Sequence, residues 1–145
     1  MTLNSSISYL QNNLKLAMDV FKILIVGAGG FLGSVSRLLM VRFIDQKVGV
    51  VFPYGTLTVN LVGSFLLGVI FALSQRSSDS DTTEHWRLFL ATGFCGGFTT
   101  FSAFALENLL LMNNKMVGTF ALYTGLSLLA GVLAVAFGAW CTRFL

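Results

Sequence analysis

Charged side chains are scarce in this sequence: only 10% of its 145 residues are Asp, Glu, Lys or Arg, whereas 55% are hydrophobic. Three stretches, at 48–75, 88–106 and 116–142, contain none of these four residues and no histidine. An uncharged apolar run of about 18 residues or more is long enough to cross a bilayer as a helix. A soluble helical bundle would instead show polar faces at a period of 3.6 residues. The scarcity of charge therefore argues against a soluble domain.

The residue sets that carry enzyme chemistry are also missing from the apolar stretches. They hold no acid pair, no Ser/His/Asp set and no cluster of His and Cys; Cys95 and Cys141 lie singly within apolar runs. The segment at 27–33, GAGGFLG, superficially resembles a dinucleotide-binding loop, but its third glycine is one position late and no strand–helix alternation follows. The net charge of +3 comes from Lys and Arg beside the apolar runs, so nucleic acid is not an expected partner. An enzyme is not expected.

Four membrane-spanning helices are predicted instead, at about 23–44, 56–75, 86–112 and 117–143. Residues 1–21 form a leader, in which Leu10, Leu14, Met18 and Phe21 have the spacing of a short interfacial helix. The connections are too short for a second domain. The expected fold is an all-α membrane protein, with 22–145 as a single four-helix transmembrane domain.

Basic residues are divided almost evenly between the two predicted sides of the membrane. The side with both termini holds five, and the other holds three, or four if Arg37 is counted: Lys15, Lys22, Arg76, Arg87 and Arg143 against Arg42, Lys47 and Lys115. The positive-inside rule needs a clear excess to fix one orientation. We therefore hypothesise that the chain inserts both ways and pairs as an antiparallel, dual-topology homodimer.

Polar side chains recur every four residues in two spans, which places them on one face of each helix. They are Thr56, Asn60 and Ser64 in the second span, and Thr119, Tyr123 and Ser127 in the fourth. Amide and hydroxyl donors can replace the hydration shell of a small anion, or they can bond to a neighbouring helix. The spacing alone leaves both interpretations open.

Three further features of the spans carry separate interpretations. Arg37 lies inside the first span, where it either extends to the interface or serves as an anion attractor or structural anchor. Glu107, toward the end of the third span, is the only acid there that a proton-coupled pump could use. The small-residue pairs Gly29/Gly33 and Ser64/Gly68 are typical of close helix packing.

The third span carries the most informative run, GFCGGFTTFSAF at 93–104. Paired glycines followed by paired threonines propagate a helix poorly, so a break is predicted near Gly96–Thr100. Non-helical backbone at membrane depth must line a cavity or be buried in protein, and its carbonyls are potential cation ligands. Phe101 and Phe104 follow on one face, and the positive edges of their rings can weakly favour an anion. Aromatic residues at helical spacing are also common in ordinary core packing.

These motifs together resemble the Fluc (CrcB-like) fluoride channels over about residues 23–142. The resemblance rests on GAGGFLGSVSR ending at Arg37, YGTLTVNLVGSFLLG around Asn60, and the 93–104 run. It implies an antiparallel homodimer in a bacterial inner membrane, with two pores through which fluoride leaves the cytoplasm passively. It also implies a set of pore residues: Asn60, Thr100, Phe101, Phe104, Tyr123 and Ser127.

The same resemblance implies a structural Na⁺ at the dimer centre, held by the backbone carbonyls of Gly96 and Thr99, and it identifies Arg37 with the arginine of the family's first span.

Two other classes of membrane protein are alternatives. A small proton-coupled drug exporter needs a carboxylate in the first span, which has none before Asp45. A non-transporting scaffold would not need aligned polar stripes beside a broken helix.

Overall fold

The computed structural model describes residues 3–48, 52–76 and 80–144, and these ranges are almost entirely helical. Within them, four helical stretches are long and apolar enough to cross a membrane: Gln11–Val48, Tyr54–Ser74, Thr82–Asn113 and Val117–Phe144. Their number and order are those predicted from the sequence. The first crossing belongs to α1 (Leu3–Val48), the second to α2 (Tyr54–Ser74) and the fourth to α6 (Val117–Cys141), which ends in a short 3₁₀ turn, η2 (Thr142–Phe144).

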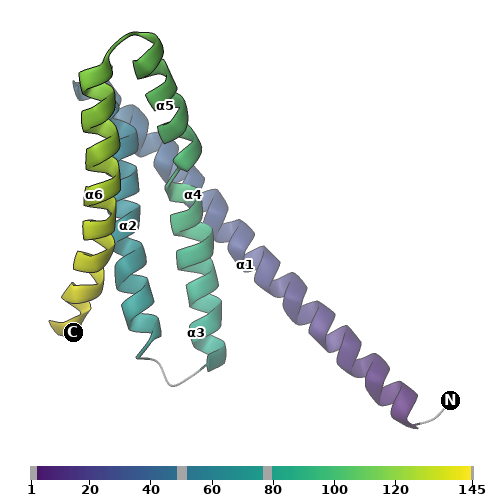
Figure 1. The fold of residues 1–145 in the computed structure, drawn as a ribbon. Helices are drawn as coiled ribbons and strands as arrows, with labels where there is room; N and C mark the ends of the chain where they lie inside the picture. Colours follow the sequence, from purple (N-terminus) through teal and green to yellow (C-terminus); the bar gives the residue numbers. More distant parts are fainter. Residues whose placement is uncertain (1–2, 49–51, 77–79, 145) are drawn as a thin grey trace.

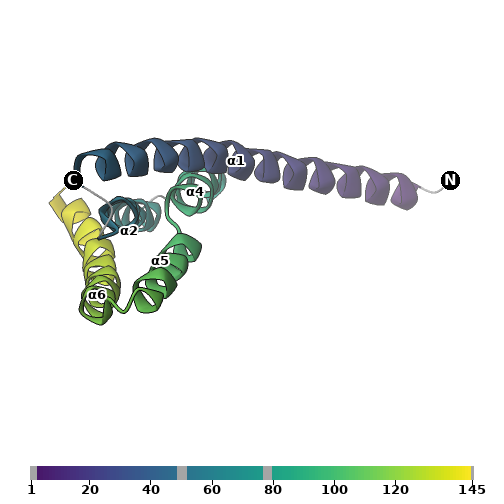
Figure 2. The same cartoon turned by 90° about the horizontal axis from the view of Figure 1, so that it is seen from above.

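The third crossing is built from four consecutive pieces. They are α3 (Ser80–Arg87), the π-helical segment η1 (Leu88–Cys95), the short α4 (Gly96–Phe98) and α5 (Phe101–Asn113). Viewed from above, α2 and α4 lie next to α1, whereas α5 and α6 lie farther from it (Figure 2). The third crossing therefore starts against α1 and moves toward α6 along its length.

The first helix is longer than the span predicted at 23–44. The leader and the span form one unbroken helix, Leu3–Val48, and not a separate interfacial helix followed by a crossing. The stretch 3–26 contains neither proline nor glycine, so no residue there favours an interruption. Residues 11–20 are all exposed, and this end of α1 extends away from the other helices (Figure 1). Whether the leader lies at the membrane interface stays a prediction.

Glycines allow α1 to contact the first half of the third crossing backbone to backbone. A Cβ atom placed on Gly29 or Gly33 would overlap the carbonyl oxygen of Phe89 or Phe94, and one on Gly93 would lie 2.8 Å from the Val26 oxygen. Close approach of this kind is how small residues join helices in membranes. The packing role predicted for Gly29 and Gly33 is confirmed.

A similar contact joins α2 to α6. A Cβ on Gly68 would overlap the carbonyl of Val135, and one on Gly138 would overlap that of Phe65. Gly68 therefore has the packing role predicted for it, whereas its partner in that prediction, Ser64, lines a cavity.

The break in the third crossing is narrower than predicted. Only Thr99 (φ −88°, ψ 160°) and Thr100 (φ −152°, ψ 121°) are extended, while Gly96 to Phe98 remain helical. The hydroxyl of Thr99 donates to the carbonyl of Cys95 at 2.9 Å, and that of Thr100 accepts from the Ala103 N–H at 3.2 Å. Thr100 thus caps the start of α5, which is a common role of threonine, while the Thr99 hydroxyl bonds back to the last turn before the break.

Candidate functional site

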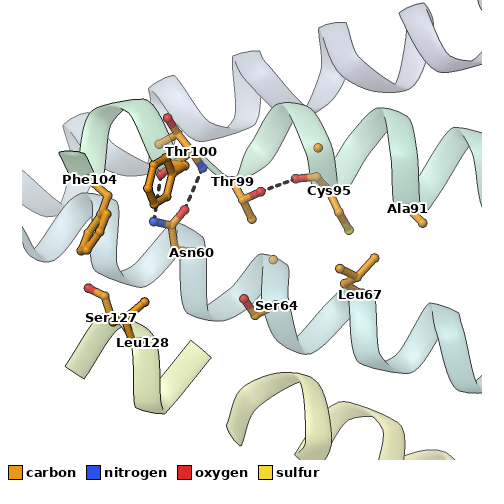
Figure 3. A pocket seen from close by; sticks show the side chains of 13 residues that line it. Asn60, Ser64, Leu67, Ala91, Cys95, Thr99, Thr100, Phe104, Ser127 and Leu128 are labelled. Atoms are coloured by element: carbon orange, nitrogen blue, oxygen red, sulfur yellow. Dashed lines mark hydrogen bonds between the residues drawn. The ribbon is translucent and has the colours of Figure 1, made fainter. Parts of the chain in front are cut away.

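A cavity of about 320 Å³ lies between α2, the broken third crossing and α6. Its walls include five of the six predicted pore residues, namely Asn60, Thr100, Phe101, Phe104 and Ser127. Gly96 and Thr99, predicted to supply carbonyls to a cation, are also in the wall, together with Ser64 and Cys95. Figure 3 shows how these side chains from three crossings converge on one space. The fold therefore gathers residues that are up to 67 positions apart in the chain, from Asn60 to Ser127.

Asn60, on α2, bonds to the extended backbone of the break. Its Oδ1 accepts from the Thr100 N–H at 2.8 Å, and its Nδ2 donates to the Thr100 carbonyl at 3.1 Å (Figure 3). A primary amide has two N–H donors, so this paired contact uses one and leaves the other. Asn60 can therefore fix the backbone of the break and still offer a donor to the cavity it lines.

At the break, two backbone carbonyls lose the N–H donors that they would have in a continuous helix. In a continuous α-helix the N–H of Thr100 would bond to the carbonyl of Gly96, and that of Ala103 to the carbonyl of Thr99. The first N–H donates to Asn60, and the second to the hydroxyl of Thr100. The carbonyls of Gly96 and Thr99 thus lose these helical donors, as expected of backbone that could bind a cation.

The two phenylalanines stand at the start of α5 and both face the cavity. Their ring centroids are 5.7 Å apart and the ring planes meet at 44°. Phe104 is half-buried, and its ring is 5.3 Å from that of Tyr123, whereas Phe101 is 76% exposed in the single chain. Phe101 is thus a large apolar side chain exposed beside the cavity, and contiguous exposure of this kind often marks an interaction surface.

Tyr123 lies behind Phe104 and is not part of the cavity wall. It is fully buried, and its hydroxyl donates to Glu107 Oε2 at 2.6 Å. The other oxygen of Glu107 accepts from the hydroxyl of Thr56 at 2.5 Å. A carboxylate from α5 is therefore held by hydroxyls from α2 and α6, directly behind the aromatic pair.

This arrangement around Glu107 was not predicted. Sequence reasoning singled out Glu107 as the one acid of the third span, and Thr56 as the first residue of a polar stripe, without joining them. A general rule could have joined them: a carboxylate in a membrane helix needs hydrogen-bond donors from neighbouring helices, and Thr56 carries such a donor.

The remaining predicted residues lie in different surroundings. Ser127 Oγ is buried beside the cavity and has no hydrogen-bond partner within the described part of the chain. Arg37 is half-buried on α1 and is not in the cavity wall, so its electrostatic or anchoring role stays a prediction. Within the described ranges, no group of three or more His, Cys, Asp or Glu side chains could hold a metal.

Comparison with known proteins gives a consistent result. The family described as "CrcB-like protein, Camphor Resistance (CrcB)" matches residues 24–139. A protein of Chlorobium chlorochromatii is 46% identical over 123 residues, which are 85% of this chain and 93% of the relative. A Leptospira interrogans protein is 40% identical over 121 residues (83% and 94%), and one from Caulobacter vibrioides is 41% identical over 123 residues (84% and 95%). All three carry the name "Fluoride-specific ion channel FluC".

Proposed function

The chain belongs to the CrcB-like family, a family of channels and not of enzymes, and from this we propose that it is a fluoride-selective passive channel that exports fluoride from the cytoplasm. It is a multi-pass membrane protein, and we place it in a bacterial inner membrane. Its physiological role in this proposal is relief of fluoride toxicity.

The observation that carries the proposal is the composition of the cavity wall. Two phenylalanine rings, the amide of Asn60 and the buried hydroxyl of Ser127 surround one space at membrane depth. Ring edges and neutral donors attract a small anion without the tight binding of a full positive charge, and weak binding lets the ion leave again. The wall includes no charged side chain.

Passive export follows from the acid–base chemistry of hydrogen fluoride. The neutral acid crosses membranes, ionises in a more alkaline cytoplasm and is trapped there as the anion. A pore then suffices for the anion to leave down its gradient. Glu107, the acid that a proton-coupled pump would need, already accepts hydrogen bonds from Thr56 and Tyr123. This occupied carboxylate favours a structural role over proton shuttling.

We propose that the working unit is an antiparallel homodimer with dual topology and two pores. Phe101 lines the cavity and yet is 76% exposed in one chain, so a second copy would complete the wall. Gly96 is exposed as well, and a Cβ added there would meet no atom within 4 Å. The even division of basic residues supports insertion in both orientations. Reporters of each compartment fused to the C-terminus should both give signals; a signal from one side only would contradict dual topology.

We also propose that Na⁺ binds at the centre of this dimer as a structural ion. The carbonyls of Gly96 and Thr99 are the ligands, because the donors that would occupy them in a helix bond elsewhere. Carbonyl oxygens suit a hard cation, and a bound ion would neutralise part of the negative charge on these two oxygens. Replacing Na⁺ by a large organic cation should lower both the thermal stability of the dimer and its fluoride flux. Unchanged stability and flux would argue against the ion.

The channel itself is tested by reconstituting the purified protein in liposomes loaded with potassium fluoride or potassium chloride. After valinomycin is added to carry potassium, the external anion is followed with an ion-selective electrode. Rapid loss of fluoride with retention of chloride is expected. Fluoride loss no faster than from empty liposomes, in a preparation shown to be folded and dimeric, would overturn the proposed function.

A further inference from the structure

The helix that carries both phenylalanines has little apolar packing within its own protomer. Of the residues in α5, only Asn108 and Leu111 are buried, while Leu106, Leu109 and Leu110 are exposed. Asn108 is only 8% exposed, although a buried amide is costly unless it is bonded. A polar residue thus stands where a leucine would be expected.

Both ends of the Asn108 amide are used. Its Oδ1 accepts from the hydroxyl of Thr124 on α6 at 2.8 Å, and its Nδ2 donates to the backbone carbonyl of Phe104 at 2.9 Å. The amide therefore connects α6 directly to the turn of α5 from which the Phe104 ring projects.

A second polar contact between α5 and α6 lies beside the Asn108–Thr124 hydrogen bond. Glu107 and Tyr123 are the preceding residues in each helix, and they are bonded at 2.6 Å. The ring of Phe104 rests against that of Tyr123, at 5.3 Å between centroids. Two neighbouring polar contacts fix both the rotation and the height of α5 on α6. Of the residues in these two contacts, Asn108 is the one whose side chain also bonds to the backbone of Phe104.

These ties matter more in a membrane than equivalent ties would in water. Lipid tails are as apolar as leucine, so the exposed leucines of α5 give no strong preference for one position over another. Hydrogen bonds between helices have directions and lengths, and they can set a position to within a fraction of an ångström. The position of Phe104 then depends on these two contacts, and the Asn108–Thr124 bond is the one whose amide also bonds to the Phe104 carbonyl.

We propose that Asn108 and Thr124 are positioning residues for Phe104, and that their hydrogen bond sets the fluoride selectivity of the pore. This inference rests on the proposed function. Neither residue lines the cavity, so they act through the aromatic ring and not on the ion. Loss of the bond removes the contact between α6 and the turn that carries Phe104, so the Phe104 ring edge shifts relative to the ion path although Glu107 still bonds to Tyr123.

The test uses the full-length protein in liposomes with Thr124→Val, which keeps the shape and removes the hydroxyl, and Thr124→Ser, which keeps the hydroxyl. Thr124→Val and Asn108→Leu are each expected to lower fluoride flux about three- to tenfold and to reduce the fluoride-to-chloride ratio. Thr124→Ser should stay within about twofold of the unchanged protein. The double variant Thr124→Val/Asn108→Leu should be no worse than Asn108→Leu alone, because Asn108→Leu already removes the bond to Thr124.

A spectroscopic readout separates this inference from the channel proposal. With 4-fluorophenylalanine at position 104, the ¹⁹F resonance should shift or broaden in Thr124→Val and not in Thr124→Ser. A label at the exposed Phe144 is the control and should not respond. If the unchanged protein conducts no fluoride, the proposed function fails while this readout still tests the positioning of Phe104.

Two results would overturn the inference while leaving a conducting channel. One is flux, selectivity and ¹⁹F spectrum all unchanged in Thr124→Val and Asn108→Leu. The other is equal impairment of Thr124→Ser and Thr124→Val, which would trace the effect to side-chain shape and not to the hydrogen bond.

Discussion

The two halves of the third crossing are held in place by different means. The first half, η1 and α4, contacts α1 backbone to backbone, through glycines on both sides. The second half, α5, is held by side chains: Asn60 at its start, and Glu107 and Asn108 farther along. Thr99 and Thr100 separate the two.

The difference shows how a membrane protein can combine a rigid support with a precisely placed site. Backbone packing fixes the first half closely against α1, and this half contributes only small residues, Ala91, Cys95 and Gly96, to the cavity wall. Side-chain hydrogen bonds leave space between α5 and its neighbours, and the cavity occupies that space. The first half should therefore be sensitive to added volume, and the second to the loss of single polar or aromatic groups.

The largest effect should come from adding one methyl group where α1 packs against the first half. In Gly29→Ala the new Cβ would collide with the Phe89 carbonyl, a backbone atom that cannot move aside alone. We expect a loss of about 1–3 kcal/mol or more in stability, seen as a lower unfolding temperature and less monodisperse protein. Gly27→Ala is the matched control, since a Cβ there meets nothing within 4 Å. Equal behaviour of the two variants would contradict backbone packing.

A substitution in the aromatic pair should separate function from folding. Phe101→Ile and Phe104→Ile remove the ring edges, and Phe101 is too exposed for its packing in one chain to matter much. We expect fluoride flux at least about tenfold lower, an increase of about 1.4 kcal/mol in the barrier, with dimers retained. Flux is measured in liposomes and assembly by size-exclusion chromatography. Normal flux in both variants would remove the aromatic pair from the mechanism.

A smaller effect is expected at the break itself. Thr100→Ala removes the hydroxyl that caps α5 at the Ala103 N–H, and such caps contribute about 1 kcal/mol. Faster hydrogen exchange of the Ala103 amide should report the loss. Thr100→Ser keeps the hydroxyl and should preserve slow exchange; fast exchange in both would show that the cap is unimportant.

The smallest effect should come from the contact between α1 and α3, the piece that precedes the first half. Lys22 on α1 and Glu84 on α3 form an ion pair at 2.6 Å, with side chains 28% and 43% exposed. Pairs in such surroundings contribute little to stability and are screened by salt. Lys22→Met should lower the unfolding temperature slightly in low salt and less in high salt. Lys15→Met, at an exposed position of the same helix, is the control and should change it less.

The four crossings and the presence of a break could be predicted because both depend on local composition. The location of the break was less predictable. Gly96 and Gly97 favour a break by propensity, but both stay helical, and a Cβ on Gly97 would overlap the Gly30 carbonyl on α1. The packing partner decides what these glycines do, and no single-helix pattern contains it. The π-helical turns of η1 gave no sequence signal.

The candidate site shows the same limit. Spacing placed Thr56, Asn60 and Ser64 on one face of α2, but each meets a different neighbour. Thr56 bonds to Glu107, Asn60 bonds to the backbone of Thr100, and Ser64 lines the cavity. Periodicity within a helix predicts which residues share a face. It cannot predict which helix lies opposite, or which of the residues remain available to an ion.

The unbroken length of α1 has a geometric consequence for the bilayer. Its 46 residues extend about 69 Å at 1.5 Å per residue, whereas the hydrocarbon layer is about 30 Å thick. Even at a tilt of about 40°, the upper end of the usual range, about 26 residues span that layer. About 20 residues of a straight α1 must then project beyond the hydrocarbon. Residues 3–22 are rich in Asn, Ser, Gln and Lys, so this end of the rod can leave the hydrocarbon layer without a hydrophobic mismatch.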